Sequence, residues 1–157
     1  MVTHATQKLR TEDALQADKP PASPEKREND SPCPEASGTI LLVEDSDALR
    51  EITKAFLQIA GYSVLEARNG ADALGLAREF KSPIHLLLTD VVMPGMSGLD
   101  LAKTLCAFHP ESRLLFMSGY TETGISDHGM PDKAIHFLTK PFSGQSLTMK
   151  VREILDT

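Results

Sequence analysis

The 157-residue chain has no tryptophan and only two cysteines, and it contains no long apolar run. Cys33 and Cys106 lie too far apart in the sequence for a thiolate metal motif and form no disulfide framework, which suits a reducing compartment. No apolar run reaches the roughly 18 residues that are needed to cross a bilayer, and the N-terminus lacks the apolar core of a signal peptide. We therefore expect a cytoplasmic chain without a membrane segment.

Positive charge is also scarce. The formal net charge is -6, and the one close basic pair, Lys26-Arg27, is flanked by Glu25 and Glu28. Nucleic-acid backbones are polyanions that attract clusters of lysine and arginine. The charge balance therefore argues against binding to DNA.

The first 37 residues have few large apolar side chains but contain half of the ten prolines. Such a segment cannot bury enough apolar surface to offset the entropy lost on ordering. We expect residues 1–37 to be a disordered N-terminal tail and residues 38–157 to form one folded domain.

From Gly38 onward, short apolar runs alternate with segments of helical periodicity. This alternation predicts an α/β fold, a doubly wound parallel sheet with helices on both faces. The first helical segment carries Ala48, Leu49, Ile52, Ala55, Phe56 and Ile59 at helical spacing. The expected strands are residues 39–43, 63–67, 85–90, 113–118 and 134–139.

The segment from Tyr120 to Pro131 has the weakest helical pattern. It contains Gly124 and Gly129 and little apolar periodicity, and each glycine costs about 1 kcal/mol relative to alanine inside a helix. We expect a short, marginal fourth helix there.

Polar residues stand at the ends of four expected strands: Glu44 and Asp45, then Asp90, Ser118 and Lys140. Parallel strands end at one edge of the sheet, so these groups should converge. Three acids together suit a hard cation such as Mg²⁺, and an aspartate beside it can act as a nucleophile toward phosphorus. Each residue alone has an ordinary structural explanation, as a helix start, a surface charge or a strand-end hydroxyl. Their joint occurrence favours a site.

In these motifs the sequence resembles the receiver domain of two-component response regulators, over residues 39–156. The resemblance implies a flavodoxin-like fold, a five-stranded parallel sheet in the order 2-1-3-4-5 with five helices. The matching motifs are Leu41-Leu42-Val43-Glu44-Asp45, Thr89-Asp90-Val91-Val92-Met93-Pro94-Gly95-Met96-Ser97-Gly98, Phe116-Met117-Ser118-Gly119-Tyr120 and Phe137-Leu138-Thr139-Lys140-Pro141-Phe142.

The resemblance implies that Asp90 accepts a phosphoryl group in a phosphorelay. The donor would be a phosphohistidine on a sensor histidine kinase or a histidine phosphotransfer protein. Asp45, Asp90 and the backbone carbonyl of Val92 would ligate Mg²⁺, and Glu44 would act through a water on the metal.

The remaining roles are also implied by the resemblance. Ser118 would bond a phosphoryl oxygen, Lys140 would pair with it, and Phe137 would be the switch aromatic. The signal would pass to an output partner protein at the face made by the fourth helix, fifth strand and fifth helix. The Lys140-Pro141 bond would be cis.

Some residues depart from the commoner family pattern: Glu44 stands for aspartate, Ser118 for threonine and Phe137 for tyrosine. None of these departures removes an essential group, so we expect a competent receiver. Val92 and Tyr120 flank the site and are bulky or apolar, so they should hinder an attacking water, and we expect slow self-dephosphorylation.

Other functions fit less well. A receiver piece of a hybrid histidine kinase is a close variant, although Met1 and the long tail favour an independent chain. An aspartate-dependent phosphohydrolase usually needs a second acid two residues after the nucleophile, where this chain has Val92. A nucleotide- or flavin-binding module needs a glycine-rich loop after the first strand, where this chain has Glu44-Asp45-Ser46-Asp47. We therefore expect a signalling protein and not an enzyme.

Overall fold

The structure is a computed structural model, and it describes residues 37–119 and 134–156. All of these residues belong to the compact unit Pro34–Thr157. The expected marginal helix between Tyr120 and Pro131 lies outside the described residues, as does the expected tail up to residue 36. The boundary between residues 37 and 38 stays a prediction.

Five parallel strands form one sheet: β1 (Thr39–Val43), β2 (Ser63–Ala67), β3 (Leu86–Asp90), β4 (Arg113–Ser118) and β5 (Ile135–Thr139). Their order is β2-β1-β3-β4-β5, so the predicted order is confirmed. Val43 is level with Thr89 across β1 and β3, and Ser118 is level with Thr139 across β4 and β5. The strands therefore end together at one edge.

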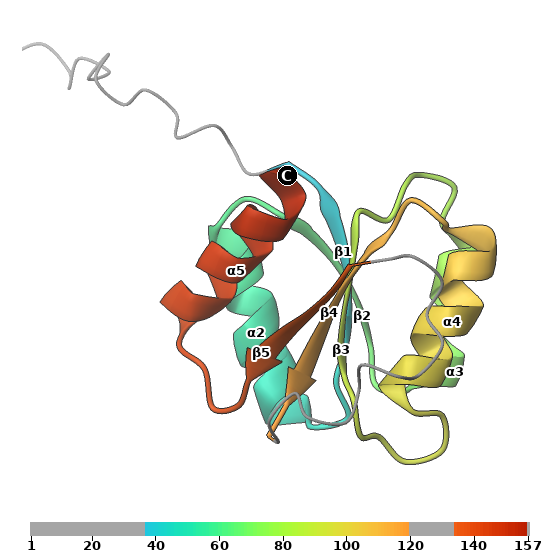
Figure 1. The fold of residues 1–157 in the computed structure, drawn as a ribbon, viewed down its shortest axis with the longest axis horizontal. Helices are drawn as coiled ribbons and strands as arrows, with labels where there is room; N and C mark the ends of the chain where they lie inside the picture. The colour runs from blue at the N-terminus through green and yellow to red at the C-terminus, as the bar shows by residue number, and fades with distance from the viewer. Residues whose placement is uncertain (1–36, 120–133, 157) are drawn as a thin grey trace, which may run out of the picture. The chain divides into compact units, whose positions relative to one another are not determined.

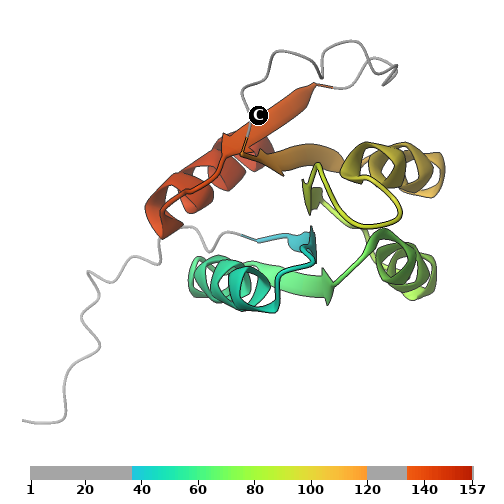
Figure 2. The same ribbon diagram turned by 90° about the horizontal axis from the view of Figure 1, so that it is seen from below.

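Within the described residues there are four helices: α2 (Asp47–Ile59), α3 (Gly70–Glu79), α4 (Gly98–Phe108) and α5 (Gly144–Asp156). Helices α2 and α5 cover one face of the sheet, and α3 and α4 cover the other (Figure 1, Figure 2). Ser46 and Ser97 cap α2 and α4, because their hydroxyls accept the N–H groups of Leu49 and Asp100. None of these helices has the length and apolarity that a membrane span requires.

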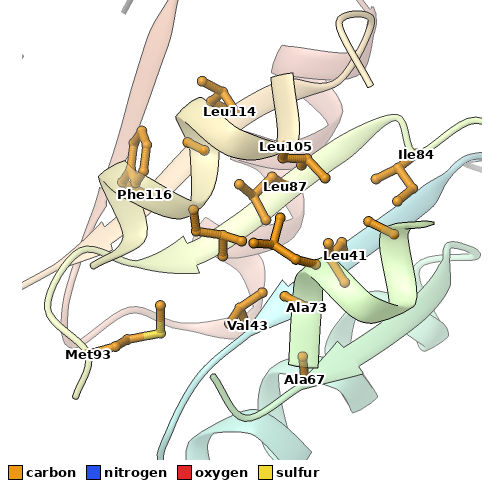
Figure 3. Packing of buried hydrophobic residues seen from close by; sticks show 14 residues of the cluster. Leu41, Val43, Ala67, Ala73, Ile84, Leu87, Met93, Leu105, Leu114 and Phe116 are labelled. Atoms are coloured by element: carbon orange, nitrogen blue, oxygen red, sulfur yellow. The ribbon is translucent and has the colours of Figure 1, made fainter. Parts of the chain in front are cut away.

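The three central strands, β1, β3 and β4, are buried on both faces, and their side chains alternate between two cores. Leu41, Val43 and Leu87 point toward α3 and α4, in the cluster that Figure 3 draws. Their neighbours Leu42 and Leu88 point toward α2 and α5. This alternation is why the strands read as continuous apolar runs in the sequence.

The buried face of α2 differs from the one that apolar spacing predicts. Ile52 is 53% exposed and Ile59 is 84% exposed, while the helix buries Arg50, Thr53 and Leu57. The two polar side chains can be buried because each has partners: the Thr53 hydroxyl donates to the Leu49 carbonyl at 2.7 Å, and Arg50 makes ion pairs. An apolar stripe is thereby left facing outward.

Candidate functional site

Three carboxylates meet at the carboxyl edge of the sheet. Glu44 and Asp45 follow β1 directly, Asp90 ends β3, and β1 and β3 are neighbours. One oxygen from each of the three lies within 4.8 Å of the others. Glu44 is buried, Asp90 is half-buried and Asp45 is exposed. The structure thus brings together the three acids that the sequence predicts.

Lys140 bridges two of these acids from the turn after β5. Its Nζ donates to Asp90 Oδ2 at 2.8 Å and to Glu44 Oε2 at 2.9 Å. Desolvation lowers the pKa of Lys140, but the bonds to Asp90 and Glu44 outweigh it and raise the pKa above its ordinary value. The lysine is therefore held as an ammonium ion inside the acidic cluster.

Both carboxylate oxygens of Glu44 accept bonds within the protein. Oε2 accepts from Lys140, and Oε1 accepts the Ser46 N–H at 3.1 Å. Burial raises the pKa of Glu44, and the bonds from Lys140 and Ser46 oppose that rise only in part. Both oxygens of Glu44 are thus engaged within the protein. Asp45 is exposed and is therefore more open to a ligand.

The loop after Asp90 is shaped by the start of α4. Asp90 Oδ1 accepts the Val92 N–H at 3.3 Å, and the Gly98 N–H donates to the Val91 carbonyl at 3.0 Å. A Cβ on Gly98 would clash with the Asp90 carbonyl. Gly98 therefore lets α4 approach the end of β3, a role that its place in the matching motif did not reveal.

Ser118 and Phe137 lie on the neighbouring strands. Ser118 is buried at the end of β4, and its carbonyl accepts the Lys140 N–H at 2.8 Å. The partly buried Phe137 ring lies 5.8 Å from the Phe116 ring, between centroids. The Lys140-Pro141 bond is cis, as predicted. The roles of Ser118, Phe137 and the Val92 carbonyl stay predictions.

The donor atoms of this edge fit a hard divalent cation. Carboxylate oxygens are the ligands that Mg²⁺ prefers, and it keeps several waters of its own. Three converging carboxylates with one ammonium between two of them leave negative charge that such a cation would offset. The residues present therefore fit the magnesium that the sequence predicts.

Sequence reasoning missed one charged side chain beside this cluster. Arg50 of α2 donates from Nη1 to the Glu44 carbonyl at 2.9 Å. No strand end or motif singled it out, and the apolar spacing of the helix did not mark its position as buried.

Comparisons with known proteins agree with this geometry. Residues 40–152 match the family described as "Response regulator receiver domain". The chain is 38% identical over 139 residues to sensor kinase CckA of Brucella abortus (strain 2308), covering 88% of this chain but 15% of that protein. It is 33% identical over 116 residues to response regulator receiver protein CpdR of the same strain, covering 74% of this chain and 95% of that protein.

Solved structures show the same likeness. The receiver domain from hybrid histidine kinase CckA is 39% identical, with a TM-score of 0.64 over 75% of this chain and 99% of that one. Chemotaxis protein CheY4 of Vibrio cholerae is 28% identical, with a TM-score of 0.69 over 76% of this chain and 100% of that one. The predicted flavodoxin-like fold is confirmed.

Proposed function

Because this chain belongs to the response regulator receiver domain family, we propose that it is a phosphoacceptor of a phosphorelay, with Asp90 as the accepting residue. The observation that carries this proposal is the pairing of Asp90 with Lys140 inside a cluster of acids at the carboxyl edge of the sheet. As an acceptor, the chain is a signalling component and not an enzyme.

The reaction is a transfer of one phosphoryl group from nitrogen to oxygen. An Asp90 carboxylate oxygen forms the new P–O bond while the P–N bond to the donor histidine breaks. The electron pair of that bond returns to the imidazole nitrogen, which is then protonated. Asp45, Asp90 and the Val92 carbonyl would hold Mg²⁺, with Glu44 in its outer shell. When bound, the ion would offset the charge that builds up on the phosphoryl oxygens.

The proposed role of Lys140 is to pair with the negative charge of the phosphoryl group. Its Nζ already touches Asp90 Oδ2, so a phosphoryl group on Asp90 would meet the ammonium as an ion-pair partner. The Ser118 hydroxyl would bond another phosphoryl oxygen, and Phe137 would move inward as the hydroxyl is drawn to the phosphate. We propose that the output partner then binds at the face that β5 and α5 contribute to.

The phosphate donor must reach Asp90 across the rim of the site, and α2 begins two residues after Asp45. Four apolar residues of α2 are exposed at a spacing of four, three and four residues: Ala48, Ile52, Ala55 and Ile59. This spacing forms one stripe along a helix. We propose that a helix of the donor protein packs on this α2 stripe while its histidine faces Asp90.

Relatives of two kinds give this function two variants. The likeness to sensor kinase CckA covers 15% of that protein, so the same chemistry would serve in a receiver piece of a hybrid histidine kinase. The likeness to CpdR covers 95% of that receiver protein, so the same chemistry would also serve in a receiver that acts by itself. Both variants use Asp90 in the same way.

The test is the intact mass of the protein after incubation with Mg²⁺ and a small-molecule phosphodonor such as acetyl phosphate. We expect the wild type to gain one phosphoryl group and Asp90→Asn to gain none, because the amide is not a nucleophile. Equal gain in both proteins would assign the phosphate to another residue. No gain in the wild type would point to an interaction module that works without phosphorylation.

A further inference from the structure

Arg50 is a buried cation that the proposed phosphotransfer chemistry does not use. Its side chain is 11% exposed, and its guanidinium reaches three separate parts of the fold. Nη1 donates to the Glu44 carbonyl at 2.9 Å, Nη2 donates to Asp47 Oδ1 at 2.5 Å, and Nε lies 4.0 Å from Glu66 Oε2. These partners belong to the turn after β1, the first turn of α2 and strand β2.

The short turn between β1 and α2 carries two of the three acids of the site. Glu44 and Asp45 both lie between the last residue of β1 and the first residue of α2. Within the turn, the Ser46 N–H donates to Glu44 Oε1 at 3.1 Å. Arg50 adds a bond to the main chain of the turn from outside it, so the carbonyl of Glu44 is tied to the body of α2.

A buried guanidinium keeps its acceptors in place because leaving one of its N–H groups without a partner costs free energy. Its planar fork can serve two acceptors in a fixed geometry, here the Glu44 carbonyl and the Asp47 carboxylate. The residue next to Glu44 is Asp45, which the proposed function makes a magnesium ligand. The position of the ligand therefore depends on the position of Arg50.

We propose that Arg50 is a positioning residue for the magnesium site: by holding the main chain of Glu44, it holds Asp45 at the distance from Asp90 that a shared cation requires. This inference rests on the proposed function, because that function supplies the metal. Outer partners that orient metal ligands typically change metal affinity by about 10- to 100-fold when they are removed.

The positive charge of Arg50 has the opposite effect on magnesium affinity to that of its positioning role. A cation near the site repels Mg²⁺, so the loss of its charge alone would strengthen magnesium binding. Asp47 and Glu66 pair with the guanidinium and offset most of that repulsion. We therefore expect the geometric effect to outweigh the electrostatic one. The two effects change the Kd for Mg²⁺ in opposite directions when Arg50 is replaced by a neutral residue.

The test measures the Kd for Mg²⁺ by titration calorimetry, with no phosphodonor present. We expect Arg50→Met to weaken magnesium binding about tenfold. The matched control is Lys54→Met, which removes one positive charge from the same helix, and the Lys54 Nζ also pairs with Glu66, at 3.4 Å. Lys54 makes no hydrogen bond or ion pair with the turn, so we expect the Kd of the Lys54→Met variant to stay within about twofold of the wild type.

Thermal unfolding of each variant separates a local effect from general destabilisation. A folded Arg50→Met protein with unchanged or tighter magnesium binding would overturn the proposal, as would a wild type that binds no Mg²⁺. If Arg50→Met fails to fold, Arg50→Lys decides: it keeps the charge but lacks the fork, so weaker binding supports positioning and unchanged binding overturns it. Labelling of Asp90 is measured separately, so failure of the proposed function is distinguishable from failure of this role.

Discussion

Val92 is an apolar side chain left exposed beside Asp90, with 69% of its surface accessible. Its N–H donates to Asp90 Oδ1, which places the side chain at the rim of the site. Hydrolysis of a phosphorylated Asp90 needs a water that is oriented toward the phosphorus, and valine offers that water no hydrogen bond. The residue at this position should therefore control how long the phosphoryl group lasts.

We predict that Val92→Asn speeds self-dephosphorylation about fivefold, because one hydrogen bond to the attacking water contributes about 1 kcal/mol. The measurement is loss of phosphoryl mass from purified protein over time. Val92→Ala is the control, since it opens the rim without adding a polar group. If the asparagine variant loses phosphate at the wild-type rate, or no faster than the alanine variant, this role of Val92 is wrong.

Single residues also show what the sequence could predict about the site. Glu44, Asp45, Asp90 and Lys140 were predicted to converge because each stands at or just after a strand end, and that position is readable from apolar runs. Arg50 and Gly98 were not predicted in their roles. What they do depends on contacts with the carbonyls of Glu44 and Asp90, which leave no mark on residue type or spacing.

Among the helices and strands, α2 departs most from expectation, because its exposed face is the one that was expected to be buried. Its apolar spacing predicts a helix correctly, but the α2 stripe faces outward because satisfied polar groups occupy the buried side. Periodicity identifies a helix and an apolar face, whereas the neighbouring elements decide which face is covered. An apolar stripe that stays open is more typical of an interaction surface than of a solvated one.

We predict that Ile52→Asp slows transfer from a phosphorylated histidine phosphotransfer protein that labels the wild type, by about fivefold or more. Labelling by acetyl phosphate should stay unchanged, because a small donor does not need the stripe. An exposed position also tolerates the substitution with little loss of stability.

Met149→Asp is the matched control for this experiment. Met149 is also an exposed apolar residue, 63% accessible, but it belongs to α5. Equal slowing in both variants would mean that the stripe has no special role. Slower labelling by acetyl phosphate in Ile52→Asp would mean that the substitution damages the site itself.

For the molecule as a whole, magnesium binding at the acidic edge of the sheet should raise the thermal stability of the fold. Three carboxylates repel one another, and among the described residues Lys140 is the one cation that pairs with them, through Glu44 and Asp90. A ligand that binds the folded state alone stabilises it by about 2.7 kcal/mol at a hundredfold excess over its Kd.

We predict that Mg²⁺ raises the midpoint of thermal unfolding by several degrees. Asp45→Asn should lose most of this shift and should melt at a higher temperature than the wild type when no metal is present, because it removes one repelling charge. The measurement is a melting curve with and without Mg²⁺ at constant ionic strength. A shift of equal size in Asp45→Asn would place the metal elsewhere.

The strands and the identity of the converging groups could be predicted from the sequence alone. These features are local: a buried run or a carboxylate at a strand end can be read within a few residues. The strand order came from the family resemblance, and the pairing of the strands confirms it.

Which groups within the site touch depends on how the elements pack against one another. Lys140 reaches both Asp90 and Glu44, the latter 96 positions away in the chain, because β1, β3 and β5 end at one edge. Arg50 reaches the Glu44 carbonyl across the turn after β1 and also reaches Glu66 of β2, because α2 folds back along β1 and β2. Such bonds join residues through the packing of whole elements, and residue spacing carries no record of that packing.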